Sequence, residues 1–174
     1  MNIDFRPLFF LMFFPVVWGC SSEKRPDGMP PLHPCRITIT QDGAPLEGAT
    51  VVLHATSDGT RWRCSGVTDA GGVVNLQTQG QFRGVPAGTY KVTVEKEEVV
   101  SLATPEQLAA LERAKAENPQ WYDPPKFKYE SWQLVSKEYT QEATTLHEIT
   151  VSSGQNSATF DVGKAVRVKQ DLSE

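Results

Sequence analysis

Short segments of alternating polarity, separated by turn residues, restrict the fold of this sequence more than any other feature. Between residues 36 and 95, most of these segments are followed by a cluster of Gly, Asp or Pro. The alternation predicts strands that bury one face, and the clusters predict tight turns between them. The expected strands span 36–40, 50–55, 60–68, 73–78 and 89–95. Short strands at this spacing are typical of an antiparallel sandwich, so the sequence predicts an all-β fold.

The direction of the side chains follows from the same alternation. Successive side chains of a strand point to opposite faces, so Ile37 and Ile39 share one face. Tyr90, Val92 and Val94 are likewise expected to face inward. Further strands are expected near the carboxyl end, at 132–139, 146–153 and 157–168.

Three stretches of this region resemble a known family. They are "DGAPLEGATVVLHA" at 42–55, "GVTDAGGVVNLQT" at 66–78 and "GVPAGTYKVTV" at 84–94. In this order they resemble the carboxypeptidase regulatory-like domain of the transthyretin-like (prealbumin-like) group, over about 36–97. The resemblance implies an antiparallel seven-stranded prealbumin-like (Ig-like) β-sandwich. With the stretch 137–162, the chain is most similar to short planctomycete lipoproteins that carry this domain.

The first 19 residues have the plan of a secretory signal peptide. Arg6 precedes an apolar run at 8–18, and the small Gly19 follows it. The run is shorter than the roughly 20 apolar residues that a membrane-spanning helix needs. Export is therefore the leading interpretation of 1–19, and a short transmembrane or buried segment is the alternative.

The residues "VVWGC" resemble the lipobox of bacterial lipoproteins. That resemblance implies cleavage before Cys20 and attachment of lipid to its sulfur. Two or three acyl chains anchor a protein stably where one does not. The expected partner is thus a membrane, and the expected location is the cell envelope, on the periplasmic side or at the outer membrane.

The rest of the chain divides into a tether, one domain and a tail. Residues 20–34 are rich in proline and predict an extended tether, in which His33 is expected to be solvated. The sandwich is expected to span 35–168, and a carboxyl-terminal tail 169–174.

Two cysteines remain once Cys20 is assigned to the anchor. Cys35 and Cys64 form an even pair in a chain expected to be exported, which favours a disulfide. Two free thiols are the alternative. A metal site is not expected, because no histidine lies at ligand spacing from either cysteine.

An insertion of helical and aromatic character is expected at about 101–131. Thr104 and Gln107 have the spacing of a capping box, and Pro119 ends the helical pattern, so a helix is predicted over 104–118. Leu108 and Leu111 give it a narrow apolar stripe. The helix is expected to cover a sheet edge, or alternatively to act as a lid that binds a partner.

Five aromatic residues follow this helix among prolines: Trp121, Tyr122, Phe127, Tyr129 and Trp132. Flat rings offer large apolar surfaces at small entropic cost, so these residues are candidates for a carbohydrate- or peptide-binding surface. The alternative is a loop pinned to the domain by its own side chains.

Signals for other functions are weak. A net charge of −4, with no dense block of Lys or Arg, argues against nucleic acid as a partner. His33, His54 and His147 occur outside any catalytic motif, and no cofactor is indicated. The expected function is a non-enzymatic binding or structural module that contacts envelope proteins or glycans. A carbohydrate or small-ligand binder, or a hydrolase using His54 or His147, is the alternative.

Overall fold

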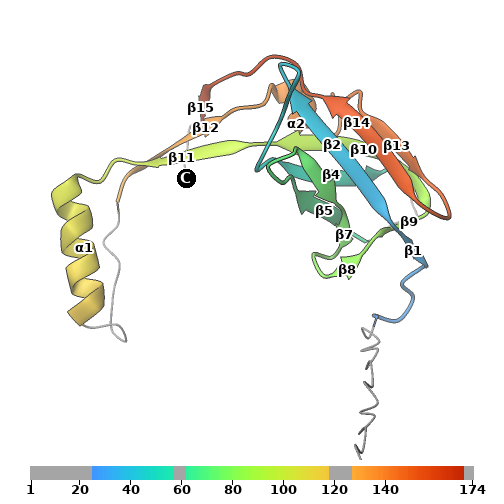
Figure 1. Cartoon of the computed structure of the whole chain (residues 1–174), viewed down its shortest axis with the longest axis horizontal. Helices are drawn as coiled ribbons and strands as arrows, with labels where there is room; N and C mark the ends of the chain where they lie inside the picture. The colour runs from blue at the N-terminus through green and yellow to red at the C-terminus, as the bar shows by residue number, and fades with distance from the viewer. Residues whose placement is uncertain (1–24, 57–61, 118–126, 171–174) are drawn as a thin grey trace, which may run out of the picture.

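The structure is a computed structural model that describes residues 25–56, 62–117 and 127–170 (Figure 1). Strands dominate it, and the described residues contain two helices, α1 (Pro105–Glu117) and α2 (Lys137–Thr140). The expected all-β class is therefore confirmed. Neither of these helices has the length and apolar character that would let it span a bilayer.

The larger sheet is antiparallel throughout and has the strand order β13-β10-β4-β5-β7-β8. Its central strands β4 and β10 pair from Tyr90 opposite Ala55 to Glu95 opposite Thr50. The strands of this sheet are β4 (Thr50–Ala55), β5 (Cys64–Val67), β7 (Gln77–Thr78), β8 (Phe82–Arg83), β10 (Gly88–Glu95) and β13 (Glu148–Val151).

The second sheet contains one parallel pair, which differs from the antiparallel arrangement that was expected. Its strands are β2 (Cys35–Gln41), β3 (Ala44–Pro45), β6 (Val73–Asn75) and β14 (Asn156–Asp161). β14 runs parallel to β2, from Asn156 opposite Cys35 to Asp161 opposite Thr40. The chain leaves the larger sheet at the end of β13 and enters this sheet as β14, so the turn between them does not close a hairpin.

The expected strand 73–78 is divided between the two sheets. β6 pairs with β2, whereas β7 pairs with β5. Leu76 lies at the crossing point and is buried in the core. The turn before β6 forms as expected, because the Asp69 carboxylate accepts hydrogen bonds from the backbone N–H groups of Gly71 and Val73, both at 2.9 Å.

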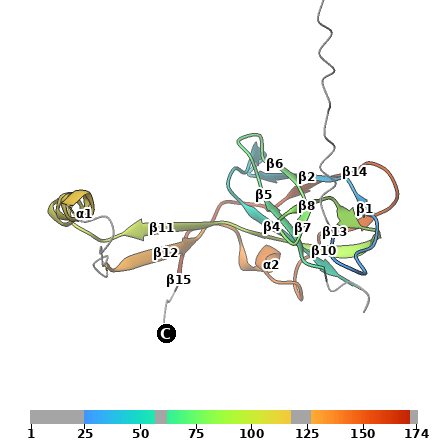
Figure 2. The same cartoon turned by 90° about the horizontal axis from the view of Figure 1, so that it is seen from below.

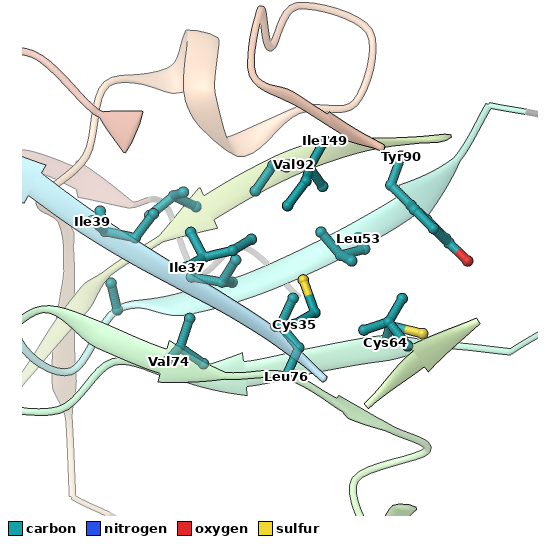
Figure 3. Close-up of a cluster of buried hydrophobic side chains, with 14 of the residues drawn as sticks. Cys35, Ile37, Ile39, Leu53, Cys64, Val74, Leu76, Tyr90, Val92 and Ile149 are labelled. Atoms are coloured by element: carbon teal, nitrogen blue, oxygen red, sulfur yellow. The ribbon is translucent and has the colours of Figure 1, made fainter. Parts of the chain in front are cut away.

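The core lies between the two sheets, and Figure 3 shows side chains from both sheets pointing toward one another. Ile37 and Ile39 are fully buried, and Tyr90, Val92 and Val94 are also buried. The inward positions expected from alternation are thus confirmed. The Tyr90 hydroxyl donates a hydrogen bond to the Pro86 carbonyl at 2.9 Å, which satisfies its polar end inside the core.

The chain forms a short strand pair before Cys35. Leu32 and His33 form β1 (Leu32–His33), which pairs with β9 (Val85–Pro86). His33 is half-buried rather than solvated, so this strand pair lies inside the segment 20–34 that was expected to be a tether. Gly84 permits this contact, because a Cβ at its position would lie 2.8 Å from the His33 carbonyl oxygen.

A separate three-stranded sheet carries α1 away from the sandwich, as both Figure 1 and Figure 2 show. It consists of β11 (Glu97–Ser101), β12 (Tyr129–Gln133) and β15 (Val168–Gln170), in that order. We call these strands, α1 and residues 102–104 and 127–128 the arm. Two expectations are corrected here. The strand expected at 132–139 ends at Gln133 and is followed by α2, and the tail expected from 169 begins within β15.

Candidate functional site

The helix of the arm forms as its sequence predicts, but none of its residues is buried. The Thr104 N–H donates to the Gln107 side-chain oxygen at 2.8 Å, and the Gln107 N–H donates to the Thr104 hydroxyl at 3.2 Å. This is the expected capping box. No residue of α1 is buried, and Figure 1 shows the helix apart from the sandwich, so it does not cover a sheet edge there.

Exposed apolar side chains gather on the arm. Of the seven large hydrophobic residues that are exposed in the described chain, two, Val67 and Leu146, lie outside the arm. The other five are Val99, Leu102, Leu108, Tyr129 and Val168. Scattered exposed apolar residues are normal, whereas five of them on one projecting element are a local concentration.

Three of the five aromatic candidates for a ligand platform lie within the described residues, and the two on β12 lie on opposite faces of their sheet. Trp121 and Tyr122 lie outside the described residues, and Phe127 is half-buried. Tyr129 and Trp132 are three positions apart on β12, so their side chains point to opposite faces of the arm sheet. The described part of the candidate platform is therefore split.

One face of the arm sheet is occupied by charged side chains. The Arg167 guanidinium lies 4.3 Å from the centre of the Trp132 ring and 3.2 Å from the Glu98 carboxylate. Lys169 pairs with Glu130 at 2.6 Å on the same face. One face of the Trp132 ring is thus covered by a cation–π contact.

His54 links two polar groups on the outer side of the larger sheet. Its Nε2 lies 2.9 Å from the Thr93 hydroxyl, and its Nδ1 lies 3.4 Å from the Glu142 carboxylate. A carboxylate, an imidazole and a hydroxyl in this order have the composition of a nucleophile with its base. Thr93 is only 6% exposed, so a substrate carbonyl has no access to its hydroxyl. The cluster holds the segment around Glu142 against the sheet.

His147 lies between two aromatic rings at the edge where the sheets separate. Its ring centre is 5.1 Å from that of Tyr139 on α2 and 4.7 Å from that of Phe160 on β14. Its Nε2 lies 3.0 Å from the Asp161 carbonyl oxygen. Burial lowers the pKa of His147 below its ordinary value of 6.5, although the nearby Asp161 carboxylate opposes this effect.

We expect the stack around His147 to weaken as the pH falls. A histidine whose pKa is lower in the folded state binds its proton more tightly when the chain is unfolded. Its contribution to the unfolding free energy is therefore complete above pH 6.5 and is lost as the pH falls through the folded pKa. Replacing His147 by Phe keeps a ring between Tyr139 and Phe160. Denaturant unfolding between pH 7 and about pH 5 should show a smaller loss of stability in this variant. Equal pH dependence in both proteins would contradict this role of His147.

Cys35 and Cys64 lie in the same core cluster, one on each sheet, and both are free thiols in the structure. Burial raises the pKa of Cys35 to about 11, and the neighbouring Cys64 adds to this shift. Their proximity is compatible with the expected disulfide, which stays a prediction. Cys35 also lines an open pocket of about 510 Å³, together with Pro34, Asn75, Leu76, Gln77, Arg83 and Gly84.

The described residues contain no group of three His, Cys, Asp or Glu side chains placed to hold a metal ion. His54 and His147 belong to the separate clusters described above, and His33 lies in β1. Sequence reasoning missed the residues that define the two faces of the arm, Val99, Arg167 and Val168. The only feature of the nearby sequence that could have singled them out is that each is an apolar or basic residue among polar neighbours.

Comparisons with known proteins place the chain in no family. No protein-family model matches the sequence, and no curated protein is significantly similar to it. A solved structure of a 9R-lipoxygenase from Cyanothece PCC8801 aligns with 14% sequence identity and a TM-score of 0.31. The alignment covers 82% of this chain and 18% of the lipoxygenase chain. This chain thus spans less than a fifth of that enzyme, and a TM-score this low carries no argument about fold or function.

Proposed function

We propose that the protein is an exported envelope lipoprotein, anchored through Cys20, that acts as a non-enzymatic binding module of carboxypeptidase regulatory-like type. The arm is the surface that it offers to another protein. The observation that carries this proposal is that five of the seven exposed large hydrophobic residues in the described chain lie on the arm.

The stability of the arm supports the same proposal. An isolated helix of about 12 to 15 residues is marginal in water, and α1 has 13 residues with none buried. A small sheet likewise needs a packed apolar face to be stable by itself. Binding to a partner would bury the exposed apolar side chains and hold both elements in place.

The anchor would keep the sandwich close to the membrane. Eleven residues separate Cys20 from Leu32, where β1 begins. Fully extended, a segment of this length reaches at most about 40 Å. A tether this short presents the arm to proteins of the same membrane surface.

Shortening the arm tests the proposal. Ser101 and Tyr129 lie opposite each other in the register of β11 and β12, so Asn-Gly can replace residues 102–128 as a two-residue hairpin turn. We expect the melting temperature of the sandwich to change by only a few degrees, because α1 buries no residue. Formaldehyde cross-linking in intact cells should then lose the protein adducts formed by the full chain.

The His54→Ala variant serves as the control for this experiment, because it changes a polar cluster outside the arm and should keep all adducts. If the shortened chain keeps the full set of adducts, residues 102–128 are not part of the binding surface, and the proposal is then confined to the strands of the arm, which keep Val99, Tyr129 and Val168.

A further inference from the structure

The pocket that Cys35 lines lies where the chain passes from one sheet to the other. Cys35 and Leu76 form its buried wall, and Pro34 and Gly84 also line it. The Leu76 N–H donates to the Cys35 carbonyl, and the Leu76 carbonyl accepts from the Gly84 N–H, both at 3.0 Å. These backbone groups are therefore already paired. We call this space the Cys35 pocket, and Figure 1 shows its strands β7 and β8 in the sandwich, apart from the arm.

Three polar side chains line the same pocket, those of Asn75, Gln77 and Arg83. Gln77 and Arg83 lie directly opposite each other in the register of β7 and β8, which places their side chains on one side of the sheet. None of the three side chains makes a hydrogen bond or an ion pair with a described residue. No Asp or Glu is among the residues that line the pocket. The Cys35 pocket thus combines one positive charge and two carboxamides with an apolar wall.

Another open pocket, of about 390 Å³, shows how this differs from an ordinary surface hollow. It is lined by residues of β12 and β15, among them Gln133, Lys169 and Gln170. These polar side chains already have partners, because Gln170 donates to Gln133 and Lys169 pairs with Glu130. In the Cys35 pocket the corresponding groups are unpaired and can all serve a ligand.

We propose that the Cys35 pocket binds a small carboxylic acid that also carries an amide, of the size of a short acylated peptide. The guanidinium group of Arg83 presents paired N–H donors that match the two oxygens of a carboxylate. The carboxamides of Asn75 and Gln77 each offer a donor and an acceptor, as a peptide group does. Small apolar groups of the ligand then lie against Leu76. This inference goes beyond the proposed function, because the pocket uses no residue of the arm.

The size of the pocket fits a ligand of this class. Its volume of about 510 Å³ lies within the range of about 300 to 1,000 Å³ that is usual for small-molecule sites. The peptide acetyl-dialanine has about 14 non-hydrogen atoms, for which an ordinary ligand efficiency gives a dissociation constant of about 1 mM. Arg83 is exposed, so salt screens its charge and we expect weaker binding at high ionic strength.

Saturation-transfer NMR with acetyl-dialanine as the probe tests the proposal on the full chain, held in detergent micelles. We expect the methyl groups of the probe to take up saturation with a dissociation constant of about 1 mM, and empty micelles to give no such signal. The carboxamide of the same peptide lacks the charge and should bind at least about tenfold more weakly. Equal binding of the acid and the carboxamide would overturn the proposal, and so would the absence of binding by the acid at about 10 mM.

Variants locate the binding in the Cys35 pocket. Arg83→Gln keeps a hydrogen-bond donor but removes the charge, and it should weaken binding of the acid at least about tenfold. The matched control, Arg113→Gln, changes an exposed arginine of α1 and should leave binding unchanged. Both variants should melt like the parent, because both side chains are exposed. If Arg83→Gln binds the acid as tightly as the parent, the site is not in this pocket. That result would leave the proposed function of the arm standing, since no residue of the arm takes part.

Discussion

The Gly72→Ala variant is expected to lose more than about 3 kcal/mol of unfolding free energy. Gly72 has a φ of +71°, in the left-handed region that alanine rarely adopts. A Cβ here would overlap the Ile39 carbonyl oxygen and lie 3.0 Å from the Leu46 nitrogen. The carbonyl cannot move aside, because it accepts a hydrogen bond from the Leu46 N–H at 3.0 Å. The clash would therefore displace β2 at the centre of the core.

Gly43→Ala is the matched control. Gly43 has a φ of +75°, but its Cβ would meet no atom within 4 Å. It should cost only about 1 kcal/mol, which is the backbone cost alone. Denaturant unfolding of both variants measures the difference. Similar losses for the two would mean that β2 and the turn before β6 are not packed as described.

The second large effect concerns the disulfide expected between Cys35 and Cys64. Its formation closes a loop of about 30 residues, and reducing it should lower the unfolding free energy by about 3 to 4 kcal/mol. The measurement is denaturant unfolding of protein from the envelope with and without reductant. The Cys35→Ala/Cys64→Ala variant should not respond to reductant.

The buried thiols add a kinetic expectation. Because burial raises the pKa of Cys35 to about 11, little thiolate is present in the folded protein at neutral pH. Reoxidation of the folded, reduced protein should therefore be slow compared with oxidation during folding. If both cysteines of the unreduced envelope protein react with an alkylating agent under denaturing conditions, the bond does not exist.

Features that depend on neighbouring residues could be predicted from the sequence. The inward direction of Ile37, Ile39 and Tyr90 follows from alternation within one strand. The helix start at Thr104 follows from a capping interaction that spans three residues. In each case the residues that decide the structure lie within one element.

Features that depend on distant pairing could not be predicted in this way. Whether residues 73–78 stay in one sheet is decided by the strands next to them. Nothing in the sequence around Leu76 indicates that the chain passes there from one sheet to the other. The parallel pairing of β14 with β2 joins residues about 120 positions apart. The placement of Val99 and Val168 on one face of the arm sheet is similar, because it arises only through the register of β12. Alternation within β11 alone gives no hint of it.

The aromatic residues show that closeness in the sequence does not predict a shared surface either. Their proximity in the sequence suggested one platform, but a spacing of three on a strand separates Tyr129 from Trp132. The contact of Arg167 with Trp132 joins residues far apart in the chain, so the composition of the loop could not reveal it.

The central claim is that a lipid on Cys20 holds this binding module at a membrane, and the mass of the native protein tests it most directly. Protein extracted from the membrane fraction should begin at residue 20 and carry the added mass of two or three acyl chains. A Cys20→Ser variant should leave that fraction and retain residues 1–19. An unmodified chain that still begins at Met1 and is recovered from the soluble fraction would contradict the account.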